Sequence, residues 1–400
     1  MKRSAGFLSA TVLSMFALPG WASDDEWSAV VGKRTLTEFM SGLRVERTLP
    51  NGEISRGEYR ADGTGTLYSW GEAFSRTWRI QGEEKLCITD RQGEVCYSID
   101  RHRTDPDRYR VREVATDKET EIRVSERHVT IDAAPEEIGS KGGAAMASAD
   151  ELAAELSNPN TAVASLTFKN QFRWFEGDLP DADSQSNYTL LFQPALPFVL
   201  GDGDKIIWRP AVPLIFDQPI PKSDGGFDGK SGLGDIAFDL VYAPKRDDGL
   251  LLAYGIISSL PTATNDLGSD RWTLGPEVFI AKSYSKGLYG IFPSHQWDIG
   301  GSGDKDINLT TIQPIFTYLP GGGWNVGTGP SITYDWETEQ WTVPLQINFG
   351  KTVVLNGRPW KLSAEINYFI EKADAFAPEW MLSLNVTPVV KNGLASWFGL

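Results

Sequence analysis

Histidine, cysteine and surplus positive charge are scarce in this 400-residue sequence. Its 3 His and 2 Cys are too few for a histidine-rich metal centre, a four-cysteine zinc site or a disulfide-dense scaffold. Its 38 Lys and Arg against 53 Asp and Glu give a net charge of -15, which argues against nucleic acid as a partner. We therefore expect no metal site, no cofactor and no nucleic acid.

Long hydrophobic runs are also missing. The apolar stretch at about residues 5–18 is shorter than the roughly 20 residues that a membrane-spanning helix needs. It follows Lys2 and Arg3 and precedes Ala22 and Ser23, which indicates a secretory signal peptide, residues 1–23. Downstream there is no run of about 18 apolar residues. The exported chain is therefore expected to be either soluble or inserted in a membrane as a β-barrel.

What is abundant is glycine, proline and tryptophan, at 40, 23 and 14 residues, which is unusual for a helical protein. Residues 24–132 contain short strand-like runs separated by glycines, and predict a small antiparallel β domain. Residues 133–160 predict a linker rich in Ala, Gly and Ser, followed by a short amphipathic helix over 150–156. The remainder, residues 161–400, has a different pattern.

The two cysteines lie on either side of a turn-like stretch, residues 90–93. A hairpin at this point would bring Cys87 and Cys96 face to face, and an oxidising compartment would then favour a disulfide. Two unpaired thiols are the alternative.

From residue 161 onward the chain repeats one pattern about twelve times: ten to fourteen residues that alternate in polarity, then a turn. Phe168 and Phe172, for example, fall on one face, and Gln171 falls on the other. Long connections alternate with tight turns, as in outer-membrane barrels. The fold class predicted is all-β: a 12-stranded antiparallel transmembrane outer-membrane β-barrel preceded by a small antiparallel β domain. A large soluble β-sandwich is the alternative.

Several short motifs occur in order along the predicted barrel. They are 151–159 (ELAAELSNP), 193–197 (QPALP), 231–235 (SGLGD), 260–264 (LPTAT), 274–276 (LGP), 313–314 (QP), 334–344 (YDWETEQWTVP), 368–372 (YFIEK) and 378–380 (PEW). Through them, residues 151–390 resemble the outer-membrane family named for the MetA pathway of phenol degradation. The resemblance implies a barrel that moves small hydrophobic or aromatic molecules and has no catalytic residues. Residues 24–132 lie outside it.

Charged residues at alternate strand positions are expected to face the lumen and to line a pore. The positive candidates are Lys169, Arg173 and Arg209, opposed across the pore by Asp235, Asp239 and Glu277; Lys361 and Glu365 are further candidates. Opposite charges arranged in this way would orient a polar solute. The alternative is that the same ions simply neutralise each other inside the barrel.

A Ser-His pair could suggest an outer-membrane hydrolase, and Ser294 and His295 are adjacent. Adjacent strand residues point to opposite faces, so these two cannot act as nucleophile and base. We therefore expect no enzymatic activity and no catalytic residues.

The function predicted is a passive channel for small, aromatic or hydrophobic solutes in the outer membrane of a Gram-negative bacterium. Its expected partners are outer-membrane lipid and a small-molecule solute. The N-terminal domain would lie in the periplasm. One alternative is a closed structural or binding barrel whose periplasmic domain docks on the cell wall or on a partner protein. Another is that the N-terminal domain is a ligand-binding barrel that delivers its cargo to the pore.

Overall fold

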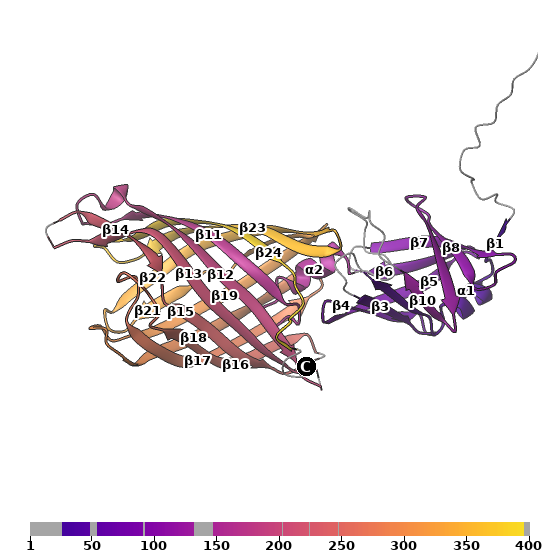
Figure 1. The fold of residues 1–400 in the computed structure, drawn as a ribbon, viewed down its shortest axis with the longest axis horizontal. Helices are drawn as coiled ribbons and strands as arrows, with labels where there is room; N and C mark the ends of the chain where they lie inside the picture. The colour runs from indigo at the N-terminus through magenta and orange to yellow at the C-terminus, as the bar shows by residue number, and fades with distance from the viewer. Residues whose placement is uncertain are drawn as a thin grey trace, which may run out of the picture.

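The computed structural model describes residues 26–48, 54–90, 93–131, 147–201, 203–223, 225–246 and 248–395. The predicted signal peptide and most of the predicted linker lie outside these residues. Two β-barrels stand end to end, a small N-terminal one and a large C-terminal one (Figure 1). None of the described helices has the length and apolar character to cross a membrane.

The small barrel contains one helix and ten strands within the described residues. They are β1 (Trp27–Ala29), α1 (Lys33–Met40), β2 (Arg44–Thr48), β3 (Ile54–Tyr59), β4 (Thr64–Ser69), β5 (Glu72–Gln81), β6 (Lys85–Asp90), β7 (Gly93–His102), β8 (Arg108–Glu113), β9 (Glu119–Ser125) and β10 (His128–Ile131). Strands β2 to β10 close into a ring through the β7–β8 pairing, and β1 adds to β7. The sheet is antiparallel, as predicted, except at one pairing, where β10 returns to lie parallel to β2 and completes the ring.

Apolar side chains fill the small barrel. Its core consists of Leu36, Met40, Leu43, Val45, Tyr59, Trp78, Leu86, Ile88, Ile99 and Val129. The outer surface instead carries exposed ion pairs such as Arg79–Glu94, 2.6 Å apart. Cys87 and Cys96 face each other on β6 and β7, with Cα atoms 4.0 Å apart, and form a disulfide. An apolar interior and a charged exterior are what an aqueous surrounding favours.

The large barrel is a closed antiparallel ring. Its elements are β11 (Ser165–Glu176), a 3-10 helix η2 (Ala182–Ser184), β12 (Ser186–Val199), β13 (Lys205–Pro221), β14 (Phe227–Leu233), β15 (Ile236–Ala243), β16 (Leu250–Leu260), β17 (Arg271–Tyr284), β18 (Gly287–Gly301), β19 (Asn308–Gly321), β20 (Trp324–Thr328), β21 (Ile332–Asp335), β22 (Gln340–Leu355), β23 (Arg358–Glu371) and β24 (Ala377–Pro388). Both β14 and β15 pair with β13, and both β20 and β21 pair with β19, so each couple is one interrupted strand. Counted in this way, the described part of the chain contains the twelve barrel strands that the sequence predicts.

The outside of the large barrel is apolar. On β22, Leu345, Ile347 and Phe349 are exposed, whereas the alternating Gln346 and Asn348 are half-buried. Exposed aromatic side chains gather near the strand ends, at Trp174, Trp272, Trp297, Trp336, Trp341 and Trp380 toward one rim and at Tyr289 and Trp324 toward the other. An apolar band between aromatic girdles is typical of strands that face lipid.

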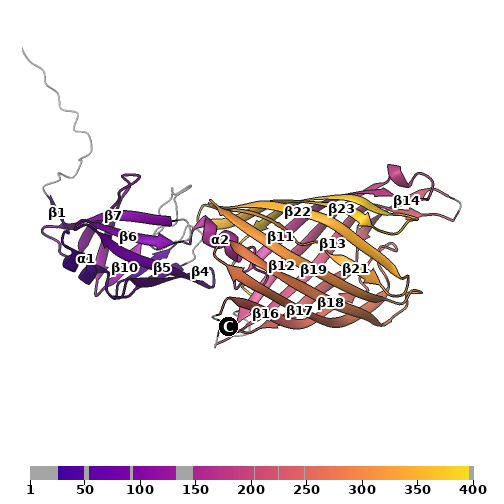
Figure 2. The same cartoon turned by 180° about the vertical axis from the view of Figure 1, so that it is seen from behind.

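The two rims differ in their connections. At one rim the strands are joined by tight turns such as 285–286 and 356–357; we call this the short-turn end. At the other rim, the long-loop end, connections such as 177–185 and 261–270 are longer. Strand β11 begins and β24 ends at the short-turn end, where the small barrel lies (Figure 2). Helix α2 (Ala149–Glu155) lies at the short-turn end against β19, β20, β22 and β23, one residue from the predicted position.

Candidate functional site: the lumen wall

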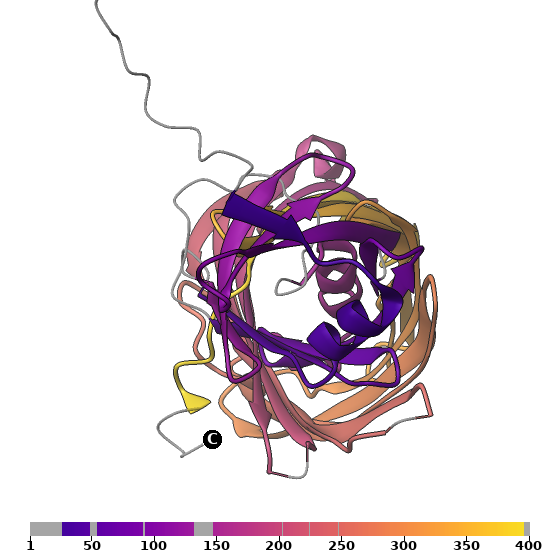
Figure 3. The same cartoon turned by 90° about the vertical axis from the view of Figure 1, so that its right-hand side faces the viewer.

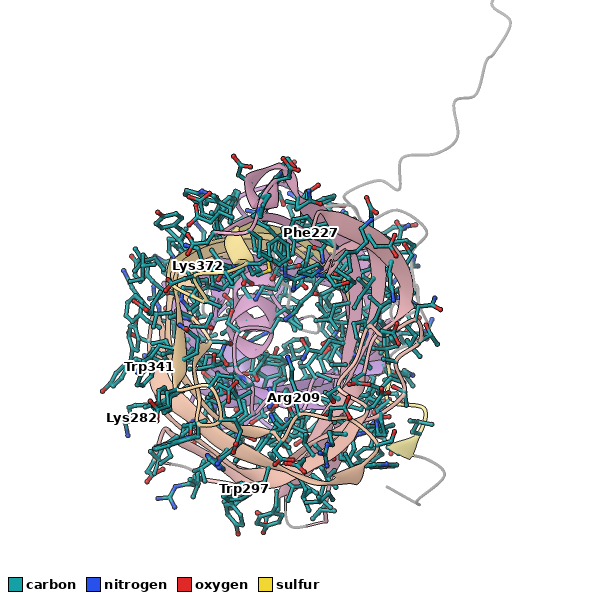
Figure 4. The ribbon with its side chains drawn as sticks, turned by 90° about the vertical axis from the view of Figure 1, so that its left-hand side faces the viewer. Arg209, Phe227, Lys282, Trp297, Trp341 and Lys372 are labelled. Carbon is teal, nitrogen blue, oxygen red and sulfur yellow. A yellow bond between two sulfur atoms is a disulfide. The ribbon has the colours of Figure 1, made fainter. Side chains whose placement is uncertain are left out.

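Strands β13 and β15 place a charged pair on the inner face of the large barrel. Arg209 and Asp239 are direct partners in the antiparallel register, and Arg209 Nε donates a hydrogen bond to Asp239 Oδ1 at 2.7 Å. Figure 4 shows Arg209 on the inner side of the ring, with Trp297 and Trp341 on the outside. The sequence analysis expected Arg209 to face a carboxylate across the pore. In the structure, its guanidinium instead pairs with Asp239 on the neighbouring strand of the same wall.

A second carboxylate, Glu277 on β17, belongs to the same wall. It pairs in register with Gly255 of β16, which pairs with Val241, two residues from Asp239. Gly255, the residue of β16 opposite Glu277, has no side chain, and Asp239 itself is opposite Ile257. Glu277 is 3% exposed, and its Oε1 has no hydrogen-bond partner among the described residues. Arg209, Asp239 and Glu277 thus give this part of the wall two carboxylates and one guanidinium.

Apolar side chains surround these charges. Inward residues of β13–β19 form a patch that we call the apolar wall: Ile207, Val241, Ala253, Phe279 and Ala281, with Leu251, Phe292 and Ile315 packed against them. The rings of Phe279 and Phe292 meet edge to face with centroids 5.5 Å apart. The guanidinium carbon of Arg209 lies 5.1 Å from the centre of the Phe292 ring, a cation–π distance.

The apolar wall was missed by the sequence reasoning. The signal was present on β17, where Val278, Phe279, Ile280 and Ala281 follow one another without alternation. Such a run predicts a strand that is apolar on both faces.

The opposite group of strands, β11, β12, β23 and β24, carries polar inward side chains that we call the polar wall. Arg173 donates hydrogen bonds to Gln171 at 2.7 Å and to Thr189 at 3.1 Å, and Asn367 donates to Glu365 at 2.9 Å. Further inward hydrogen bonds join Ser383 to Asn385, Asn385 to Ser363 and Thr387 to Thr167. Lys169 occupies an inward position on the same face, between Thr167 and Gln171. The lumen therefore has an apolar patch beside the charged residues on one side and hydrogen-bonded polar side chains on the other.

Two predicted lumen residues have other contacts. Asp235 falls between β14 and β15, and its carboxylate accepts hydrogen bonds from the backbone of Thr262, Ala263 and Ser269, at 2.7 to 3.1 Å. It fastens the long loop 261–270 instead of joining the Arg209 pair. Lys361 on β23 donates to the carbonyl oxygen of Leu156 at 3.0 Å, so it holds the segment that follows α2.

The adjacent Ser294 and His295 lie on opposite faces of β18. Ser294 pairs in register with the inward Glu277. The Nδ1 atom of His295 lies 2.8 Å from Thr310 Oγ1, and its ring centre lies 4.2 Å from that of the outward Trp297. The two side chains do not form a nucleophile–base pair.

No protein-family profile matches the chain, and no curated protein matches it. Several solved structures resemble it in shape. An outer membrane channel from Pseudomonas putida F1 matches with 13% identity and a TM-score of 0.47, over 57% of this chain and 95% of the other. The NanC porin matches with 12% identity and a TM-score of 0.35, over 56% and 99% of the respective chains. An anion-selective porin from Comamonas acidovorans matches with 10% identity and a TM-score of 0.25, over 84% and 88%.

Proposed function

We propose that the large barrel lies in the outer membrane of a Gram-negative bacterium and is a passive channel for small aromatic or hydrophobic solutes. The closed hydrogen-bonded ring and the apolar outer band support a membrane location, because lipid satisfies no backbone polar group. Outer-membrane barrels have short turns on the periplasmic side. By that rule the short-turn end and the small barrel face the periplasm.

The observation that carries the solute class is the apolar wall. A lumen lined only by polar groups would hold ordered water and favour sugars and ions. Here the partly exposed Phe292, packed edge to face on the buried Phe279, offers its ring to a passing molecule, and aromatic pairs of this kind are each worth about 0.5–1.5 kcal/mol beyond area burial. On the polar wall opposite, the buried Gln171 and Thr189 hold the partly exposed Arg173, whose guanidinium can donate a hydrogen bond to a hydroxyl group. A small aromatic molecule with one polar substituent fits both walls.

The test is uptake into proteoliposomes that carry the full-length mature protein. A neutral aromatic compound and a sugar of similar size are compared, and faster uptake of the aromatic compound is the expected result. Phe292→Gln should lower the ratio of aromatic to sugar uptake, whereas the inward polar exchange Asn348→Gln should leave it unchanged. Equal uptake of both compounds would contradict an aromatic channel.

The charged pair predicts how ions would be selected. Replacing Arg209 by Ala leaves Asp239 without its partner and removes a guanidinium from a wall that also holds Glu277. The cation preference of the channel should therefore rise, seen as a shift of the reversal potential in a salt gradient. Arg173→Ala removes a charge from the polar wall and should shift the potential in the same direction. An unchanged reversal potential in both variants would rule out these residues as selectivity determinants.

A second candidate function is a closed barrel whose periplasmic domain docks on the cell wall or on a partner protein. The observation that favours it is the position of α2 at the short-turn end, within reach of the inward Lys361. Absence of uptake by the intact protein and by every variant would favour this alternative.

A further inference from the structure

The segment between the two barrels enters the short-turn end of the large one. We call residues 147–164, which include α2, the mouth segment. In the view along the barrel axis, α2 lies within the ring of strands (Figure 3). Asp150 accepts a hydrogen bond from the backbone N–H of Gly323, in the turn between β19 and β20. On the neighbouring side, Lys361 of β23 donates to the carbonyl oxygen of Leu156.

The rest of the mouth segment continues to the other side of the ring. Lys205, at the start of β13, donates to the carbonyl oxygen of Asn160 at 2.6 Å. Asn160 Nδ2 in turn donates to the carbonyl oxygen of Leu252 on β16 at 3.4 Å. The segment is therefore bonded to the rim through β13, β16, β23 and the β19–β20 turn.

Packing between the mouth segment and the wall is tight where β16–β19 approach it. The cavity left there has a volume of about 30 Å³. Its lining comes from Ala154, Glu155, Ser157 and Asn158 on one side and Leu251, Ser283, Gly287, Leu288, Thr317 and Leu319 on the other. Such a space holds a water molecule and nothing as large as an aromatic ring. A solute cannot pass on this side while the segment is in place.

The small barrel grips the same segment through a buried ion pair. Arg76 is an inward residue of β5, and its guanidinium donates to both carboxylate oxygens of Glu151 on α2, with Nη2 to Oε2 at 2.8 Å. Both side chains are 2% exposed or less. Glu151 also closes a capping box with Ser148, accepting from its backbone N–H at 2.9 Å. One carboxylate therefore both starts the helix and fastens it to the small barrel.

Apolar contacts reinforce this grip. One buried cluster is shared by three parts of the chain: Leu67, Trp70 and Phe74 of the small barrel; Ala147, Leu152 and Val163 of the mouth segment; and Val389 beyond β24. Glu72 of β5 also accepts a hydrogen bond from the backbone N–H of Ala162 at 2.5 Å. Movement of the small barrel away from the large one would therefore pull on the mouth segment.

We propose that the mouth segment is the gate of the channel and that the Arg76–Glu151 pair is its latch. With the latch closed, the segment narrows the short-turn end. With the latch open, α2 is free to leave the ring, and the small barrel thereby controls passage. This inference rests on the proposed channel function.

The test is the current carried by full-length protein in planar lipid bilayers. Arg76→Gln should raise the open probability on the order of tenfold. It removes the charged partner of the buried Glu151 carboxylate, and that ion pair holds α2 in the closed state. The matched control is Arg79→Gln, on the same strand, which breaks the exposed Arg79–Glu94 pair and leaves the mouth segment untouched. It should behave like the unaltered protein.

A second variant acts from the large barrel and leaves the core of the small barrel intact. Asp150→Ala removes the bond to Gly323 and should also raise the open probability, by a smaller factor. If circular dichroism shows that Arg76→Gln lowers the stability of the small barrel, Asp150→Ala still tests the gate.

Raised open probability for Arg76→Gln or Asp150→Ala, with Arg79→Gln unchanged, supports the gate. Identical currents in the unaltered protein and in both variants overturn the gate and leave the channel standing. Absence of current in every form contradicts the gate and the channel together.

Discussion

In both barrels, apolar and polar side chains alternate along each strand. The small barrel turns its apolar face inward, whereas the large barrel turns its apolar face outward. In the small barrel, Trp78 points inward into the core and Arg79 points outward to Glu94. In the large barrel, Ile347 points outward and Asn348 points inward. A period of two therefore indicates a strand but does not say which face is buried.

Strand length differs between the two barrels, although β5 and β7, the longest described strands of the small one, also reach the length needed to cross a membrane. In the small barrel no described strand exceeds the 10 residues of β5 and β7, whereas β17 has 14 and β13 has 17. At about 3.3 Å per residue, and with a tilt near 45°, about 9–11 residues are needed to cross the apolar layer of a membrane. The long strands of the large barrel meet this length and also present an apolar outer face. Length and facing together, rather than alternation alone, identify the membrane barrel.

The largest effect is expected when an inward aromatic residue is removed from the small barrel, because its inner face is the apolar core. Trp78 is 6% exposed and its Nε1 donates to the carbonyl oxygen of Arg60 at 2.9 Å. Trp78→Ala should lower the free energy of unfolding of the small barrel by about 3–5 kcal/mol, through the cavity it leaves. Hydrogen exchange of small-barrel amides in urea measures this loss. The matched change Trp341→Ala, on the outer face of the large barrel, should leave those amides as protected as before.

A charge on the outer face of the large barrel should have the next largest effect. Ile347→Arg places a guanidinium on the outer face, which we expect to contact lipid. Near the bilayer midplane this should lower the free energy of unfolding by about 2–4 kcal/mol. The yield of folding into phospholipid vesicles, as a function of urea, reports this cost. Asn348→Arg, one residue along and facing inward, should fold nearly as well as the unaltered chain. If both variants were tolerated equally, the outer face would not be in lipid.

The disulfide should stabilise only the small barrel. Cys87 and Cys96 are nine residues apart, and closing so short a loop is worth about 2–3 kcal/mol in the chain-entropy view. Replacing both by Ser should lower the stability of the small barrel by that amount. The large barrel contains no cysteine, so its unfolding in the same sample is an internal control. Equal destabilisation of both barrels would show that they unfold as one unit.

The smallest expected effect is on the stability of the small barrel at acidic pH. The hydrogen bond from Arg79 holds the pKa of the Glu94 carboxyl below its usual value of 4.5. Because the folded-state pKa is the lower one, the stabilisation is complete above about pH 5 and is lost as the pH falls through the folded value. Glu94→Gln should therefore reduce the acid-induced fall in the melting temperature of the small barrel. An identical fall in both proteins would mean that the pair contributes nothing.

Much of the large barrel could be predicted because its signals are local. Alternation and turn residues lie within each hairpin, so the twelve strands and their connections follow from short stretches of sequence. The small barrel was less predictable. Helix α1 has only eight residues, of which Leu36 and Met40 are buried, too few to establish a helical period. The parallel β2–β10 pairing joins strands about 80 residues apart and leaves no local trace.

The lumen could be predicted only in part. Arg209 and Asp239 were assigned to the inner face, but their direct pairing depends on the register of β13 and β15. Asp235 was misplaced because Gly234 interrupts its strand. The contact of Lys361 with Leu156 joins positions 205 residues apart, so the role of the mouth segment could not be read from either stretch alone.

The most direct test of the comparison between the barrels is a spin-label scan along β22 in phospholipid vesicles. Both native cysteines are in the disulfide, so one cysteine introduced at 346, 347, 348 or 349 can be labelled by itself. Labels at 347 and 349 should be relaxed by oxygen dissolved in lipid, and labels at 346 and 348 by a water-soluble nickel chelate. Oxygen and nickel accessibility that failed to alternate, or alternated with the opposite phase, would contradict a barrel with lipid outside and a solute path within.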